Sequence, residues 1–167
     1  MNKYKSILIY LLVFSVFISL QTVLVPLISV GSFSPDFLLI FVVYLGVMRG
    51  HIWGSTAGFI TGLFFDLISG YLLGSSAFSK TLSGFVAGYF YNEIKSVQII
   101  KSVTFVLIVF LCSLINFSAF ALFTGFDSVS SLPVLLFDQA LPPAVYTSLI
   151  TLIYIFIVPK SSGDYIK

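Results

Sequence analysis

Charged side chains are scarce in this sequence of 167 residues, of which only 8% are Asp, Glu, Lys or Arg. A soluble domain carries about 25% charged residues, so the composition excludes an ordinary water-soluble globular protein. Hydrophobic residues make up 59% of the chain, and the mean hydropathy is +1.13. Segments of about 20 predominantly apolar residues can cross a bilayer. The sequence is therefore typical of an all-α protein that spans a membrane several times.

Cysteine and histidine are equally rare, with one residue of each. The single cysteine, Cys112, excludes an internal disulfide and a thiolate metal cluster. His51 has no nearby cysteine or acidic residue, so a metal site or a catalytic dyad lacks its parts. We therefore expect no metal, no cofactor and no enzymatic activity. The net charge of +2 is also too small to indicate a nucleic acid partner.

Six apolar segments divide the chain, and they predict spans over residues 6–27, 37–48, 52–69, 74–91, 102–124 and 133–158. If the N-terminus is cytoplasmic, the cytoplasmic side holds Lys3, Lys5, Arg49, Lys95, Lys101, Lys160 and Lys167. The loops of the opposite side contain neither Lys nor Arg, which agrees with the positive-inside rule. The pattern predicts a single transmembrane domain over residues 1–167, with six helices and both termini in the cytoplasm.

Two of these segments depart from a simple span. The segment 37–48 would be about 18 Å long as a helix, which is short for a hydrocarbon core of about 30 Å. Thinning of the bilayer or cover by neighbouring helices would accommodate it. The segment 133–158 contains Pro142 and Pro143, which remove two backbone donors. Either one helix kinks there, or a short surface helix ends near Leu141 and the span begins at the prolines.

Small residues recur every four positions in two of the predicted spans. The first series is Gly54, Gly58, Gly62, Asp66 and Gly70, and the second is Gly84 and Gly88. A step of four residues places side chains along one ridge of a helix. Glycines on such a ridge let a second backbone approach closely, which is how helices associate in lipid. These positions predict helix packing, either within the chain or against a partner protein.

Three charged residues lie inside predicted spans, namely Asp66, Lys80 and Asp138. The predicted orientation places them at a similar depth in the outer leaflet, so we expect an intramembrane polar cluster. Because intramembrane charges pair or face a wet cavity, an ion pair between Asp66 and Lys80 is the first interpretation. A polar cavity that binds a ligand and a proton path are the alternatives.

The motifs of the central segments resemble those of the MreD family. The resemblance is carried by Pro35-Asp36-Phe37-Leu38-Leu39, Arg49-Gly50, Gly58-Phe59, Gly62-Leu63, Asp66, Ser69-Gly70 and Leu73-Gly74. Gly84, Gly88, Leu141-Pro142, Ala144 and Tyr146 extend it along the chain.

This resemblance implies a non-enzymatic scaffold of the bacterial plasma (inner) membrane that helps to maintain cell shape. Such a scaffold would bind MreC, a single-pass membrane protein. Through MreC it would connect cytoplasmic MreB filaments to the peptidoglycan synthase of RodA and a class B penicillin-binding protein. The family's six-helix fold is similar to that of the substrate-binding (S) components of energy-coupling-factor transporters. The alternative function is therefore vitamin capture, with the ligand held near Asp66, Lys80 and Asp138.

Overall fold

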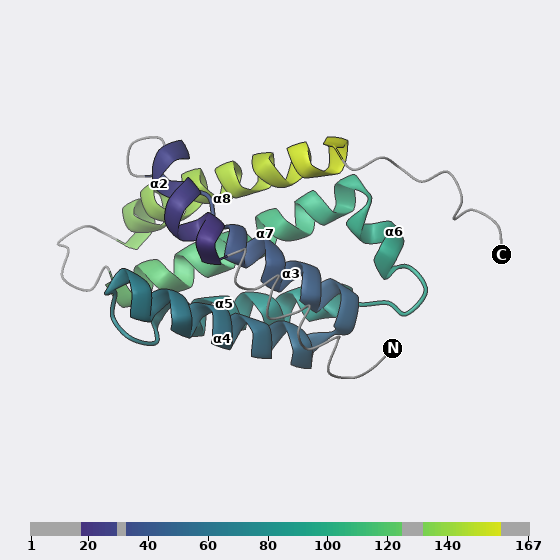
Figure 1. Cartoon of the computed structure of the whole chain (residues 1–167), viewed down its shortest axis with the longest axis horizontal. Coiled ribbons are helices and arrows are strands. Elements are labelled where there is room, and N and C mark those ends of the chain that lie inside the picture. The colour runs from purple at the N-terminus through teal and green to yellow at the C-terminus, as the bar shows by residue number, and fades with distance from the viewer. Residues whose placement is uncertain (1–17, 30–32, 125–131, 158–167) are drawn as a thin grey trace.

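The computed structural model describes residues 18–29, 33–124 and 132–157, which form helices joined by short turns (Figure 1). In chain order the elements are η1 (Leu20–Leu24), α2 (Val25–Ile28), α3 (Phe37–Arg49), α4 (His51–Ser69), α5 (Ser75–Ala87), η2 (Gly88–Phe90), α6 (Ser96–Ile100), α7 (Val103–Thr124) and α8 (Leu132–Ile157). The element η1 is a π-helix and η2 is a 3-10 helix. The described part of the chain is thus all-helical, as the composition predicts.

Helices occupy the predicted apolar segments closely. The segments 37–48, 52–69, 102–124 and 133–158 coincide with α3, α4, α7 and α8 to within one residue at each end. The segment 74–91 is divided between α5 and η2. Residues 6–17 of the first segment lie outside the described residues. The short helix α6 lies in a predicted cytoplasmic loop and was not expected.

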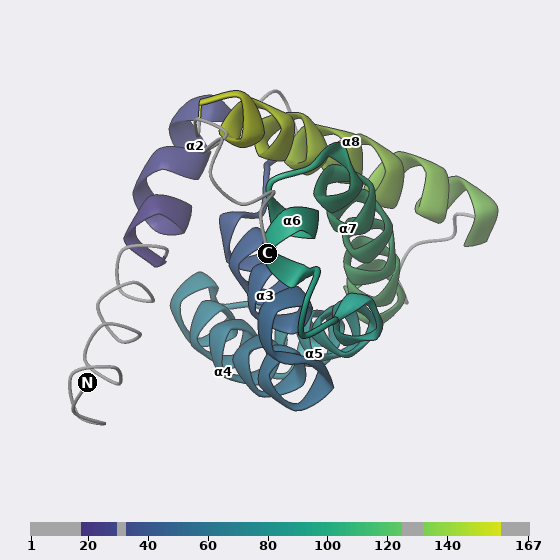
Figure 2. The same cartoon turned by 90° about the vertical axis from the view of Figure 1, so that its right-hand side faces the viewer.

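The shortest of the predicted spans forms the centre of the bundle. Figure 2 looks along the bundle and shows α3 enclosed by α4, α5, α7 and α8. Leu39, Val43 and Val47 of α3 are fully buried, and they join a core cluster that includes Phe105 and Val109 of α7. A helix of 13 residues is only about 20 Å long. Because other helices surround α3, its length does not have to match the thickness of a bilayer.

Three described helices are long and apolar enough to cross a membrane. They are His51–Ser69, Val103–Phe123 and Gln139–Phe156. Large apolar side chains of α4 are exposed along its outer face, including Phe59, Phe64 and Leu67. A continuous exposed apolar face of this kind is suited to lipid. Length and composition thus support three of the predicted spans, and six crossings stay a prediction.

The two prolines of the last segment lie within one helix. α8 runs from Leu132 to Ile157 with Pro142 and Pro143 inside it. Of the two alternatives, the structure therefore has a single helix that continues through the prolines. The hydroxyl of Thr147 donates to the Pro143 carbonyl at 2.8 Å, and that of Thr151 donates to the Thr147 carbonyl at 2.9 Å. These bonds to the helix's own carbonyls satisfy the donors of polar side chains inside an apolar helix.

Candidate functional site

The contact between α4 and α5 is made by glycines and backbone atoms. A Cβ atom added to Gly54 would lie 2.3 Å from the carbonyl oxygen of Gly84, and one added to Gly84 would lie 2.2 Å from that of Gly54. A Cβ atom on Gly58 would lie 2.3 Å from the Lys80 carbonyl oxygen. One on Gly62 would lie 2.4 Å from the Ala77 Cα atom. The two backbones are therefore too close for any larger residue, and these faces pack within the chain.

Gly70 does not belong to this contact, although its spacing predicts that it does. It ends α4 with φ +70°, and nothing lies within 4 Å of the Cβ atom it would carry. Its amide donates to the Asp66 carbonyl at 3.1 Å. Gly70 is thus a left-handed helix cap, a conformation that glycine adopts without strain. The helix-packing ridge therefore does not reach Gly70, because α4 ends at Ser69 and the chain turns at Gly70.

Two further glycines extend the contact at its other end. Gly88 packs against His51, whose Cα atom would lie 2.5 Å from a Cβ atom on Gly88. Gly46 of α3 packs against Ala87, whose Cβ atom would lie 2.8 Å away. Gly46 was missed at the sequence level. Its signal was available, since Gly46 and Gly50 precede Gly54 at the same spacing of four.

The carboxylate of Asp66 caps the N-terminus of α5. It accepts from the amide of Gly74 at 2.9 Å, from that of Ser76 at 3.1 Å and from that of Ala77 at 3.3 Å. The side chain is buried, and no lysine is needed beside it. Unsatisfied amides and the helix dipole make the N-terminus of a helix a binding site for an anion. Here α4 supplies that anion to the next helix, across the tight turn that joins them.

The ion pair predicted between Asp66 and Lys80 is wrong, because Lys80 pairs with Asp36. The Lys80 ammonium contacts Asp36 Oδ2, and both side chains are buried. Asp36 Oδ1 accepts from the Leu39 amide at 2.9 Å and so caps α3. The ring of Phe65 lies 5.3 Å from the Lys80 nitrogen, within the range of a cation–π contact. Lys80 therefore joins α5 to the start of α3.

Two uncharged side chains complete the network around Asp36. The Asp36 amide donates to Thr147 Oγ1 of α8 at 3.2 Å. Gln21 of η1 accepts from the Phe37 amide at 2.9 Å and donates to the Pro35 carbonyl at 3.3 Å. We call Gln21, Asp36, Lys80 and Thr147 the polar node. It ties η1, α3, α5 and α8 together through hydrogen bonds and a buried ion pair.

Gln21 and Thr147 were not predicted as site residues. Neither carries a charge, and neither has a partner close in sequence that would single it out. Asp138 was predicted to share a polar cluster with Asp66 and Lys80. Its backbone belongs to α8, but its side chain lies outside the described residues.

Of the remaining motif residues, Arg49 and Gly50 lie at the joint between α3 and α4, whereas Pro142 and Tyr146 lie inside α8. Gly50 separates α3 from α4 with φ +87°, where a side chain would be strained. The Arg49 guanidinium lies 5.2 Å from the centre of the Trp53 ring. Tyr146 donates its hydroxyl to the Ile28 carbonyl at 2.6 Å, which joins α8 to α2. Pro142 lies against an open apolar groove beside Tyr146. These residues thus shape the chain and join its helices.

The buried charged side chains of the site bind groups that belong to the chain itself. Among the described residues, no group of three or more His, Cys, Asp or Glu side chains is placed to hold a metal ion. Asp36, Asp66 and Lys80 are engaged by each other or by backbone amides, as given above. Groups held in this way fix the positions of helices.

The family model of rod shape-determining protein MreD matches residues 1–159. Comparison with curated proteins and with solved structures gives no match.

Proposed function

This chain belongs to the family of rod shape-determining protein MreD, and from that membership we propose that it is a non-enzymatic scaffold of the bacterial inner membrane. The family implies a role in rod shape determination. In the proposed function the chain binds an MreC-like single-pass protein. Through it the chain organises MreB filaments, RodA and a class B penicillin-binding protein for peptidoglycan synthesis during cell elongation.

The internal attachment of the helices is the observation that carries this proposal. The glycine contact and the polar node hold α3, α4, α5 and α8 in one body. Large apolar side chains such as Phe59, Leu107 and Leu149 are exposed on its outer faces. A rigid helical body with an apolar exterior offers lipid or a membrane partner a fixed surface, which is what a scaffold requires. The side chains of the polar node are buried inside it.

The proposed topology has six crossings with both termini in the cytoplasm. Three described helices are long and apolar enough to span, and α3 is a shorter apolar helix at the centre. The cations at the predicted cytoplasmic loops support this orientation. In this placement the polar node lies toward the outer face, since Asp36 precedes α3 and Arg49 ends it at the cytoplasmic side.

Vitamin capture by an S component has less support. That function needs Asp66 and Lys80 to be available to a ligand. Asp66 instead accepts three backbone amides, and Lys80 pairs with Asp36. A ligand would have to displace partners that already satisfy these charges, at a cost in binding free energy.

Affinity purification from native membranes in mild detergent, followed by mass spectrometry, tests the proposed function. We expect an MreC-like protein and wall-synthesis enzymes to remain attached. Recovery of nucleotide-binding subunits without wall-synthesis proteins would overturn the scaffold in favour of a transporter. The variant Phe59→Ser changes an exposed apolar residue of α4 and keeps the neighbouring Gly58 contact. Comparing the partner retained by Phe59→Ser with that retained by Leu149→Ser on α8 shows which outer face binds the partner.

A further inference from the structure

Two buried polar atoms in the middle of α7 have no hydrogen-bond partner within the described part of the chain. They are Ser113 Oγ and Asn116 Oδ1. The Ser113 side chain is fully buried, and Asn116 keeps only 3% of its surface exposed. Buried polar groups in proteins are nearly always bonded to protein or to ordered water, because an unpaired one is costly. Neither the glycine contact nor the polar node involves these two atoms.

The two atoms belong to neighbouring side chains on one face of the helix. Residues three positions apart on an α-helix have Cβ atoms about 5–6 Å apart, so a small molecule between Ser113 and Asn116 can reach both. Asn116 Oδ1 only accepts hydrogen bonds, whereas a serine hydroxyl both donates and accepts. A molecule that satisfies both atoms must therefore supply at least one hydrogen.

Buried hydroxyls of the adjoining helices already donate elsewhere. α7 packs along α5 and α8. The Ser83 hydroxyl of α5 donates to the Cys112 carbonyl at 3.0 Å. The hydroxyls of Thr147 and Ser148 donate to carbonyls of their own helix, α8. Each hydroxyl has one hydrogen, so these oxygens offer α7 only lone pairs. The interior beside α7 is thus rich in acceptors.

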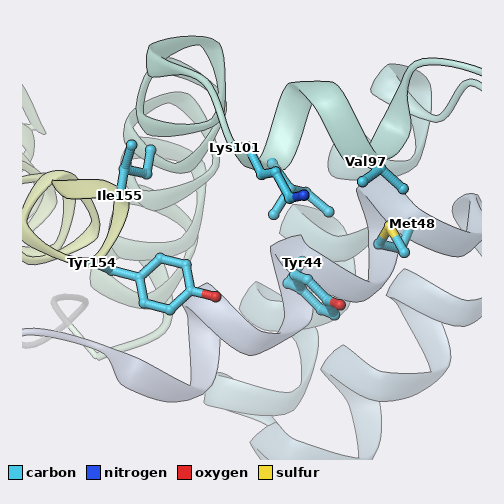
Figure 3. A pocket seen from close by; sticks show the side chains of 7 residues that line it. Tyr44, Met48, Val97, Lys101, Tyr154 and Ile155 are labelled. Carbon is cyan, nitrogen blue, oxygen red and sulfur yellow. The ribbon is translucent and has the colours of Figure 1, made fainter. Parts of the chain in front are cut away.

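The enclosed site is separate from a small cavity at the end of α3. That cavity has a volume of about 170 Å³, and Tyr44, Lys101 and Tyr154 lie around it (Figure 3). It reaches the surface, because Tyr154 keeps 49% of its area exposed. Ser113 and Asn116 do not line it. A molecule between them is therefore enclosed by the bundle and does not belong to that open cavity.

Enclosure and charge limit this molecule to water. Because Ser113 and Asn116 are closed off from solvent, the site suits the smallest hydrogen-bond donor. A buried cation would need a counter-charge. The carboxylates of Asp36 and Asp66 are engaged by Lys80 and by backbone amides. Buried water molecules typically make about three hydrogen bonds to groups that would otherwise be unpaired.

We propose that Ser113 and Asn116 bind one ordered water molecule inside the bundle. The water accepts a hydrogen bond from the Ser113 hydroxyl and donates one to Asn116 Oδ1. Its second hydrogen is left for a lone pair of an adjoining helix, which completes the usual three bonds. The site satisfies the polar side chains of α7, a helix that contributes no residue to the polar node. It depends neither on the membrane placement nor on the partner, so it can fail while the proposed function stands.

Nuclear magnetic resonance of the full chain in deuterated detergent detects this water directly. The chain has three asparagines, Asn2, Asn92 and Asn116, so isotope labelling of asparagine alone gives few side-chain signals. We expect cross-peaks between water and the Asn116 side-chain amide that have opposite sign in laboratory-frame and rotating-frame experiments, because a bound water tumbles with the protein. The exposed Asn92 is the control and should show no such pair. No cross-peak at Asn116 would overturn the proposal.

Substitutions test whether the two residues share one molecule. Ser113→Ala and Asn116→Leu should each lower the melting temperature by about 2–4 °C, because each releases the water and leaves the other atom unpaired. The double variant should melt close to the single variants and well above the sum of their losses. Thr61→Val is the matched control, because it removes a buried hydroxyl that bonds to its own helix, α4. Its loss should add to that of Asn116→Leu.

Two melting results contradict the site. A single variant that melts at or above the unchanged chain means that no molecule satisfies the two atoms, since removal of an unpaired polar group is neutral or stabilising. Additive losses for Ser113→Ala and Asn116→Leu mean that the residues do not share one water. If Asn116→Leu does not fold, the cross-peak measured on the unchanged chain decides the matter.

Discussion

The α4–α5 contact and the polar node hold helices together by opposite means. In the first, two backbones meet over Gly54, Gly58 and Gly84, with no side chain between them. In the second, the side chains of Gln21, Lys80 and Thr147 converge on one helix start. The glycine contact joins two helices that follow one another in the chain, whereas the polar node joins residues up to 111 positions apart.

The difference shows what each kind of contact contributes. A glycine contact depends on shape, so a single added side chain is enough to separate the helices. A buried polar network depends on complete pairing, and the loss of one member leaves the others unsatisfied. The glycine contact should therefore fail through steric overlap. A substitution in the polar node should destabilise the protein because it leaves a buried group unpaired. A second substitution that removes this unpaired group should restore part of the stability.

Gly58→Leu should have the largest effect. Its Cβ atom would overlap the Lys80 backbone, and since the atoms that it meets belong to the backbone, no side-chain rotation relieves the overlap. We expect a loss of more than about 4 kcal/mol, seen as failure to recover folded protein in detergent. Phe59→Leu, at the next and exposed position, is the control and should melt like the unchanged chain. Normal melting of Gly58→Leu would refute the close backbone contact.

Lys80→Met should come second, because it leaves the buried Asp36 carboxylate without its ion-pair partner. Breaking a buried pair in this way costs about 3–5 kcal/mol in the free energy of unfolding. The double variant Lys80→Met/Asp36→Asn should recover much of that loss, because neither charge then remains. Unfolding in detergent and denaturant provides the measurement.

Asp66→Asn distinguishes the two assignments of the Lys80 partner. Because Asp66 is held by backbone amides, the changes that Asp66→Asn and Lys80→Met cause in the free energy of unfolding should add within about 0.5 kcal/mol. The Asp36 and Lys80 substitutions should instead be strongly non-additive. A larger coupling of Lys80 to Asp66 than to Asp36 would restore the pairing expected from sequence and contradict the structure.

Gln21→Leu should have the smallest effect of the series. It leaves the Phe37 amide and the Pro35 carbonyl without the partners seen here, at a cost of about 1–3 kcal/mol. Hydrogen exchange at the Phe37 amide should accelerate as well. Thr22→Val, which removes a hydroxyl bonded to its own helix, is the control and should leave that amide unchanged.

The helices and the glycine contact could largely be predicted from sequence. Runs of apolar residues place α3, α4, α7 and α8, because lipid requires each backbone to satisfy its own hydrogen bonds. The spacing of four identifies Gly54, Gly58 and Gly62, because it follows from helix geometry alone. The same spacing wrongly included Gly70, since it cannot indicate where the helix ends in a turn.

The polar node could not be predicted. Lys80 lies 14 positions from Asp66 and 44 from Asp36, and sequence distance favoured the wrong partner. Gln21 and Thr147 are ordinary polar residues until α3 brings its first turn between η1 and α8. The chain by itself thus determined that it suits lipid, where its helices run and which glycines form a packing face, because each follows from composition or from the period of a helix. Only the tertiary structure decided which charges meet, because that depends on how helices far apart in sequence are placed around α3.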